Sequence, residues 1–147
     1  MGAWRTGFTS RSFSCKKPYC AWPICESNSR TQCNEYAPRG TRPTPSCTAE
    51  DVIWRYPYKD AYACSNQSPW QDPLDPATSF GFATVAPSIA QCQHCFEIVH
   101  HGAGGQFRPD DMGSKRLAGK RMIVQAVSID PGLPEGQFDL LVPGGGV

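Results

Sequence analysis

The chain has 147 residues, of which 14 are glycine, 14 are proline and 8 are cysteine, and its formal net charge is +1. A near-neutral chain without a long basic run is unlike a nucleic-acid-binding protein, and no run of about 18 apolar residues could form a membrane-spanning helix. The frequent glycines and prolines exclude long helices, and with them helical bundles and coiled coils. We expect one domain with its own core, since 39% of the residues are hydrophobic.

The first half of the chain is predicted to consist of turns and loops. Residues 1–32 are polar and rich in turn-forming residues, and residues 33–63 are typical of an extended, proline-rich loop with one short helical turn at Thr48–Trp54. Further turns are predicted within residues 68–76, where two Asp-Pro pairs occur. An apolar segment follows at residues 80–86.

The second half contains the clearest strands. Residues 95–99, 121–128 and 137–142 are short segments rich in β-forming residues. Between the first two, residues 102–120 are expected to form a hairpin-like excursion. Short strands without a long helix predict a mainly β fold, and a β-barrel rather than alternating strands and helices.

The cysteines favour disulfides over a metal site. A structural zinc site usually needs two closely spaced pairs, and only Cys92 and Cys95 have that spacing. Disulfides indicate an exported protein, and eight cysteines allow 105 complete pairings, so spacing does not give the connectivity. We therefore expect a secreted protein without a bound metal or cofactor.

Both ends of the chain suggest that it is incomplete. Residues 1–8 lack the apolar core of a signal peptide. Residues 143–147 end in a glycine run directly after a predicted strand, which leaves that strand without its next partner. We expect a truncated chain.

Four groups of short motifs, in order, resemble fungal-type endoglucanases of glycoside hydrolase family forty-five. Residues 11–23 are similar to the family's opening signature, T-T-R-Y-W-D-C-C-K-P-S-C-S-W. Residues 62–70 and 80–83 are similar to the family's Y-x-C-x-x-Q-x-P-W and Y-G-F-A segments. Residues 92–96 are similar to C-C-x-C-Y. Residues 119–125 and 137–147 are similar to G-K-x-x-x-V-Q and Q-F-D-x-x-x-P-G-G-G-V. The resemblance spans residues 9–147.

This resemblance implies a six-stranded double-psi β-barrel with long disulfide-linked loops. Residues 1–147 would form a single, incomplete catalytic domain without a separate carbohydrate-binding module. The expected protein is a secreted monomer that acts on β-1,4-glucan such as cellulose, with neither nucleic acid nor membrane as a partner. The family hydrolyses with inversion, using two aspartates about 6.5–9.5 Å apart, one as general base and one as general acid.

The chain departs from the family at the catalytic positions. Ser14 stands where the family has the aspartate that acts as general base. A serine hydroxyl does not act as a general base near neutral pH without a partner histidine or lysine. The resemblance implies that the aspartate that acts as general acid lies beyond Val147, so we expect the chain as given to be inactive. Asp139 is expected near the groove floor, whereas Asp72, Asp75, Asp110 and Asp111 are expected to be solvated turn residues.

Three residues of the opening signature are candidates for binding substrate. Trp22 matches the family's carbohydrate-stacking tryptophan. An indole suits this role because the apolar face of a pyranose packs well on it. Arg11 and Lys17 match positions that could bind sugar hydroxyls or pair with neighbouring acids. The other tryptophans, including Trp70, are predicted to be packing residues.

The resemblance also implies a disulfide pattern. The implied pairs are Cys20–Cys92 and Cys33–Cys64, and Cys25 and Cys47, which are then left over, are expected to pair with each other. Cys15 and Cys95 would then have their partners in the missing segment.

Three functions remain open at this point. The first is an endo-β-1,4-glucanase, and the second is a non-catalytic, expansin-like protein that binds cellulose or another glucan, which Ser14 fits. The third, for which the sequence has no motif, is a small disulfide-rich secreted protein that acts on a protein partner.

Overall fold

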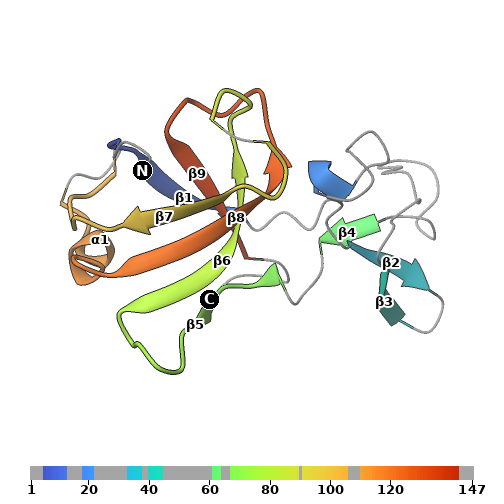
Figure 1. Cartoon of the computed structure of the whole chain (residues 1–147), viewed down its shortest axis with the longest axis horizontal. Coiled ribbons are helices and arrows are strands. Elements are labelled where there is room, and N and C mark those ends of the chain that lie inside the picture. Colours follow the sequence, from blue (N-terminus) through green and yellow to red (C-terminus); the bar gives the residue numbers. More distant parts are fainter. Residues whose placement is uncertain are drawn as a thin grey trace.

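The computed structural model describes residues 5–12, 18–21, 67–89, 91–105 and 110–142, and the backbone of residues 33–37, 40–44 and 61–63. Six of the nine strands in the described part of the chain form one sheet (Figure 1). Its strands are β1 (Phe8–Ser12), β5 (Trp70–Gln71), β6 (Thr78–Val85), β7 (Cys95–Val99), β8 (Arg121–Ile129) and β9 (Gln137–Leu141).

The strand order in this sheet is β1-β9-β6-β8-β7, and β5 pairs with β6 off that path. The sheet is mixed, because β1 runs parallel to β9 and β6 runs parallel to β8, whereas the remaining pairs are antiparallel. A register shift between Ala83 and Thr84 on β6 leaves Val127 of β8 as an extra residue, which is a β-bulge.

A second, three-stranded antiparallel sheet lies beside the first (Figure 1). It consists of β2 (Cys33–Ala37), β3 (Gly40–Thr44) and β4 (Ala61–Ala63), in the order β3-β2-β4. The described helices are short, namely the 3-10 helix η1 (Tyr19–Ala21) and the α-helix α1 (Met112–Arg116). Among the described residues, no helix has the length and apolar character needed to span a membrane.

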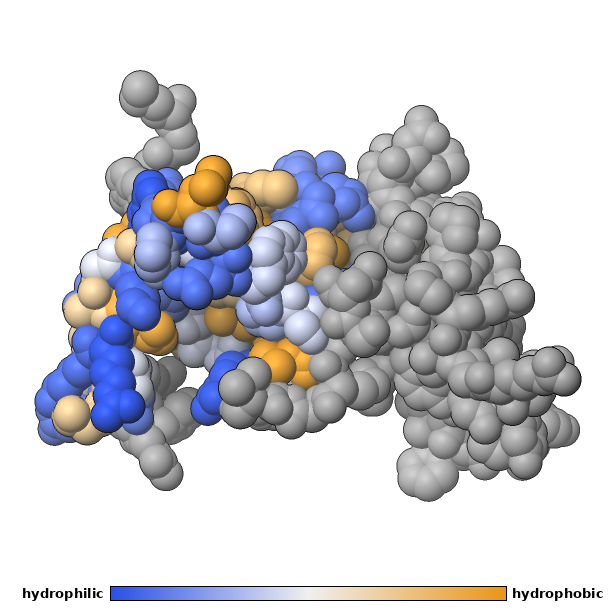
Figure 2. Space-filling view, turned by 90° about the horizontal axis from the view of Figure 1, so that it is seen from below, coloured by the Kyte–Doolittle hydropathy of each residue, from blue (hydrophilic) through white to orange (hydrophobic). Residues whose placement is uncertain are grey.

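The core lies on one side of the six-stranded sheet, which we call the inner face. It is formed by Ala83 and Val85 of β6 and by Met122, Val124 and Ala126 of β8, with Phe96, Ile98, Phe138 and Leu140 packed against them. Because successive side chains of a strand point to opposite sides, the residues between these positions lie on the other side, the outer face. Figure 2, a view of one side of the molecule, shows a mostly hydrophilic described surface with small separate hydrophobic patches.

The N-terminal end of β1 passes very close to the turn before β9. The Phe8 N–H donates a hydrogen bond of 3.1 Å to the Gly136 carbonyl oxygen. A Cβ atom at Gly7 would overlap that same oxygen, and Gly136 itself has a φ of +84°. Glycine is therefore required at both positions for this approach.

The mainly β fold is confirmed, and the predicted strands at residues 95–99, 121–128 and 137–142 correspond to β7, β8 and β9. The hairpin expected at residues 102–120 is wrong in part, because Asp111 caps the short helix α1 by accepting a 2.7 Å hydrogen bond from the Ser114 N–H.

The loops expected before residue 64 are also wrong in part, because β1, β2, β3 and β4 form there through pairing with distant strands or with each other. The helical turn expected at Thr48–Trp54 lies outside the described residues, and closure of the sheet into a double-psi barrel stays a prediction.

Candidate active site

Four polar residues lie in a row across the outer face, one on each of four neighbouring strands. The register places Ser10 of β1 beside Asp139 of β9, Asp139 beside Thr84 of β6, and Thr84 beside Ser128 of β8. Thr84 lies between the core residues Ala83 and Val85, so its side chain points to the outer face. We call Ser10, Asp139, Thr84 and Ser128 the polar row.

Asp139 is held in this row by a short hydrogen-bond chain. The Ser10 hydroxyl donates to Asp139 Oδ1 over 2.9 Å, and Gln137 Nε2 donates to Ser10 Oγ over 2.7 Å. Gln137 reaches the same face because it precedes Asp139 by two residues on β9. Within the described part of the chain, Asp139 Oδ2 makes no hydrogen bond. The carboxyl group is therefore fixed through one oxygen while the other is available to a ligand.

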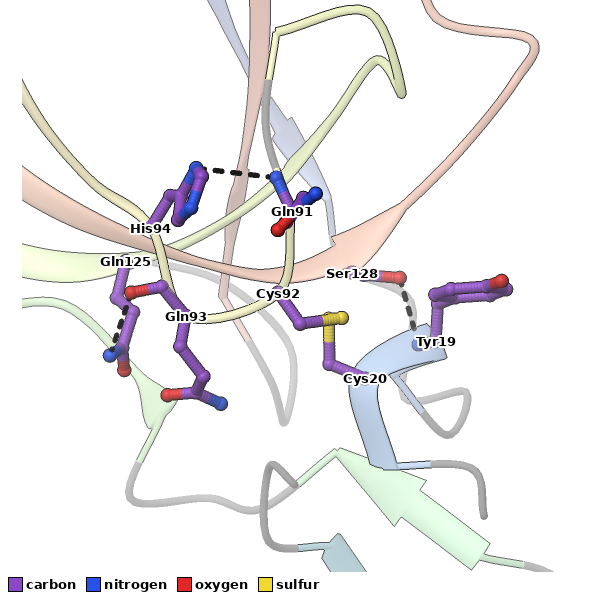
Figure 3. Close-up of a disulfide and its surroundings, with 8 residues drawn as sticks. All are labelled: Tyr19, Cys20, Gln91, Cys92, Gln93, His94, Gln125 and Ser128. Carbon is purple, nitrogen blue, oxygen red and sulfur yellow. Dashed lines mark hydrogen bonds between the residues drawn. A yellow bond between two sulfur atoms is a disulfide. The ribbon is translucent and has the colours of Figure 1, made fainter. Parts of the chain in front are cut away.

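The other end of the row is attached to the 3-10 helix η1. The Tyr19 N–H donates to Ser128 Oγ over 3.0 Å, and Cys20, which is fully buried, forms a disulfide with Cys92 with a Cα–Cα distance of 5.6 Å (Figure 3). This bond confirms the predicted Cys20–Cys92 pair. Together the two contacts hold residues 18–21 beside β8, next to the polar row.

A tight turn presents Cys92 to that disulfide. Gln93 has a φ of +72°, which is unusual for a residue other than glycine and costs about 1 kcal/mol. The turn is tied to β8, because the Gln93 N–H donates to the Ala126 carbonyl over 2.8 Å and the Ala126 N–H donates to the His94 carbonyl over 2.8 Å. Gln125 Nε2 also donates to the Gln93 carbonyl over 3.4 Å (Figure 3).

The residues predicted from the sequence are distributed unevenly over this site. Asp139 lies in the polar row, whereas Arg11 is exposed and, as the neighbour of Ser10 on β1, points to the other side of that strand. The other predicted residues lie outside the described side chains, namely Ser14, Lys17, Trp22, Cys25, Cys33, Cys47 and Cys64. Cys95 is an exposed free thiol.

The turn aspartates are confirmed as structural residues. Asp72 accepts the Leu74 N–H over 2.9 Å, and Asp75 accepts the Thr78 hydroxyl over 2.6 Å and the Ala77 N–H over 3.0 Å. The hydrogen bond from Thr78 is the main reason why the pKa of Asp75 lies below its usual value, and the nearby Arg121 guanidinium lowers it further. These carboxylates are therefore used by their own turns.

Sequence reasoning missed Ser10, Gln137, Thr84 and Ser128 as members of the site. Each lies on a strand, but these strands are far apart in the sequence, and 129 positions separate Ser10 from Asp139. Only the pairing of β1 with β9, of β9 with β6 and of β6 with β8 brings them together.

Among the described residues, no group of three histidines, cysteines or carboxylates lies close enough to hold a metal ion. A hollow of about 220 Å³ lies between β1 and β7 and is lined by residues including Arg5, Thr9, Glu97, His100 and Phe138. Burial there, together with the neighbouring His101, lowers the pKa of His100.

Comparisons with known proteins agree on one family. The model of glycosyl hydrolase family 45 matches residues 6–147, a range that contains the polar row. Endoglucanase B of Cellvibrio japonicus is 32% identical over 148 residues, which cover 96% of this chain and 26% of that protein. An endoglucanase of the springtail Cryptopygus antarcticus is 25% identical over 156 residues, which cover 97% of this chain and 56% of that protein.

A crystal structure of the cellulase from the same springtail has a similar fold. Its TM-score is 0.57 with 21% identity, over 90% of this chain and 56% of that chain. The chain therefore spans between about a quarter and just over half of the length of these relatives.

Proposed function

The chain belongs to glycosyl hydrolase family 45, and from this premise we propose that it is an endo-β-1,4-glucanase family member that binds β-1,4-glucan, such as cellulose, on the outer face at Asp139. The main support is the fixed Asp139 carboxyl group in the middle of the polar row. Serine, threonine and glutamine side chains around it are hydrogen-bonding groups suited to the hydroxyls of an uncharged sugar.

We assign Asp139 the role of proton donor to the leaving glycosidic oxygen. Its Oδ1 accepts a hydrogen bond from the Ser10 hydroxyl, so Oδ2, which has no hydrogen-bond partner among the described residues, is the oxygen that can face the glycosidic oxygen. Inverting hydrolysis then needs a second group, about 6.5–9.5 Å away, that removes a proton from water. The sequence-based expectation of an acid beyond Val147 is a competing assignment, which the Asp139 variant described below tests.

Ser14 limits the second half of this chemistry. Ser14 lies outside the described residues, and its assignment to the base position rests on the resemblance of residues 11–23 to the family's opening signature. A serine hydroxyl does not accept that proton at neutral pH. We therefore propose that this chain binds glucan and hydrolyses it far more slowly than a family member with aspartate at this position.

Ser14 also favours a second candidate, an expansin-like protein that binds glucan without chain scission. The two candidates differ in whether the remaining site is still built for hydrolysis. In both, we propose that the protein acts outside the cell, where the Cys20–Cys92 disulfide is stable, and that Trp22 and Lys17 add contacts to the sugar.

The decisive experiment restores the base. Wild type, Ser14→Asp and the double variant Ser14→Asp/Asp139→Asn would be compared by sedimentation with insoluble cellulose and by the viscosity of a water-soluble cellulose derivative. We expect all three to bind, and Ser14→Asp to raise the rate of viscosity loss by roughly 100-fold. The double variant should return to the wild-type rate, whereas Asp72→Asn in the Ser14→Asp background should not.

Each outcome tests one part of the proposal. If Ser14→Asp binds cellulose but gains no activity, Asp139 is not the proton donor, and the result fits either the expansin-like function or a proton donor beyond Val147. If the double variant stays active, Asp139 is not the proton donor. If wild type does not bind any β-1,4-glucan, the proposed function is wrong.

A further inference from the structure

Trp70 forms an exposed aromatic platform on β5. Its side chain was predicted to be a packing residue, but the residue is 47% exposed. The indole is stacked on Phe80, with ring centroids 5.5 Å apart and an interplanar angle of 21°, and Phe82 lies 5.8 Å away. The indole is therefore held by two aromatic rings, while nearly half of the residue stays exposed to a ligand.

The platform lies on the same side of the sheet as the polar row. Trp70 is directly opposite Phe80 in the β5–β6 pairing, and Phe80, Phe82 and Thr84 alternate along β6 with the core residues Ala83 and Val85. Phe80 precedes Thr84 by four residues, a separation of about 13 Å along a strand. β5 lies beside the part of β6 that is away from β9 (Figure 1).

The surroundings of Trp70 fit an uncharged ligand with an apolar surface and hydroxyl groups. Ile123, which is 38% exposed, stands opposite Phe80 on β8, and Gln125 stands opposite Phe82. These positions add an apolar contact and an amide that can bind hydroxyl groups.

The nearby charges are already paired with each other. Arg121 Nη2 lies 3.3 Å from Asp75 Oδ2, and Arg121 Nη1 lies 3.5 Å from Glu97 Oε1. The platform therefore has no unpaired cation in this cluster to attract a phosphate or a nucleic acid, whereas a pyranose ring can stack on the indole.

We propose that Trp70 is a second sugar-binding position, which stacks a pyranose ring of the same β-1,4-glucan chain that crosses the polar row. This inference rests on the proposed function and extends the binding surface along the outer side of β6. The stack with Phe80 and Phe82 holds the indole in place, so little side-chain freedom is lost on binding.

Three variants test this position. Trp70→Ala removes the platform, Trp70→Phe keeps a smaller aromatic ring, and Leu74→Ala is the matched control, because Leu74 is 92% exposed in the turn that follows β5. Binding to insoluble cellulose and to cellohexaose would be measured with thermal unfolding of each variant. We expect Trp70→Ala to weaken binding roughly three- to tenfold, Trp70→Phe to weaken it by roughly twofold because its ring is smaller, and Leu74→Ala to leave it unchanged.

The result that overturns the platform is a Trp70→Ala variant that unfolds at the wild-type temperature and still binds glucan with wild-type affinity. A destabilised Trp70→Ala is judged by Trp70→Phe: weakened binding by a normally stable Trp70→Phe supports the stacking role, and unchanged binding overturns it.

Two further outcomes also count against the platform. If Trp70→Ala changes self-association in sedimentation velocity instead of glucan binding, the occupant is a second copy and the inference is wrong. If wild type binds no glucan, the proposed function fails with it, which is a different result from wild type and Trp70→Ala binding equally.

Discussion

The inner and outer faces of the six-stranded sheet are made from alternate residues of the same strands, but they are built by different means. The inner face of β6 and β8 consists of small aliphatic side chains and Met122, and Ala83, Val85, Val124 and Ala126 are fully buried. The outer face carries the polar row, which depends on side-chain hydrogen bonds and on a disulfide-bonded helix, η1. The comparison teaches that the outer face can change its chemistry without disturbing the core, provided that its tethers remain.

The largest effect is expected from removing the tether of the outer face. Replacing both Cys20 and Cys92 by serine opens a link with a sequence separation of 72 residues, and the loss of the chain constraint in the unfolded state should cost about 4 kcal/mol. Urea unfolding followed by circular dichroism measures this loss. Cys95→Ser is the control, because Cys95 is exposed and forms no disulfide, and it should unfold as wild type does.

The double serine variant also tests whether the outer face depends on the Cys20–Cys92 disulfide. If the outer face depends on its tether, glucan binding by the double serine variant should be lost even under conditions in which the core is still folded. Equal binding by the reduced and the oxidised protein would contradict this dependence.

A smaller effect should distinguish two neighbouring residues on β8. Val124 is fully buried on the inner face, whereas Ile123 is 38% exposed on the outer face. Val124→Ala removes buried methyl groups and leaves a cavity, so we expect a loss of about 2 kcal/mol in unfolding free energy. Ile123→Ala should cost less than about 0.5 kcal/mol, and equal losses in chemical denaturation would show that the two faces are not distinct.

The smallest effect concerns pH. The pKa of His100 is lowered by burial and by the neighbouring His101. As pH falls through the ordinary range of histidine pKa values, His100 is therefore protonated in the unfolded chain at a higher pH than in the folded chain. Stability should therefore decrease as pH falls through this window. Thermal unfolding at several pH values between 5 and 8 measures this slope, and His100→Gln should flatten it. An unchanged slope in the variant would assign the pH dependence to other groups.

The inner face was more predictable than the outer one. β7, β8 and β9 are rich in β-forming residues, so local sequence was enough to locate them. β1 was missed because Phe8–Ser12 is mostly polar, and it becomes a strand through five parallel pairs with β9. The helix α1 was missed because it has five residues and depends on its Asp111 cap.

The candidate site shows the same limit. Asp139 could be named from its motif, but no local pattern indicates that Ser10 and Gln137 hold its carboxyl group or that Ser128 receives the Tyr19 N–H. These contacts are products of strand register, which short-range patterns do not specify when the partners are parallel and distant in sequence.

The close approach of Gly7 to Gly136 sets the spacing on which Asp139 depends. Ser10 follows Gly7 by three residues and Asp139 follows Gly136 by three residues, so the two glycines and the hydrogen-bonded pair belong to the same stretch of β1 and β9. A methyl group at Gly7 would wedge the strands apart at their start and lengthen the Ser10–Asp139 hydrogen bond downstream. The orientation of the Asp139 carboxyl group thus depends on Gly7, a residue that has no side chain.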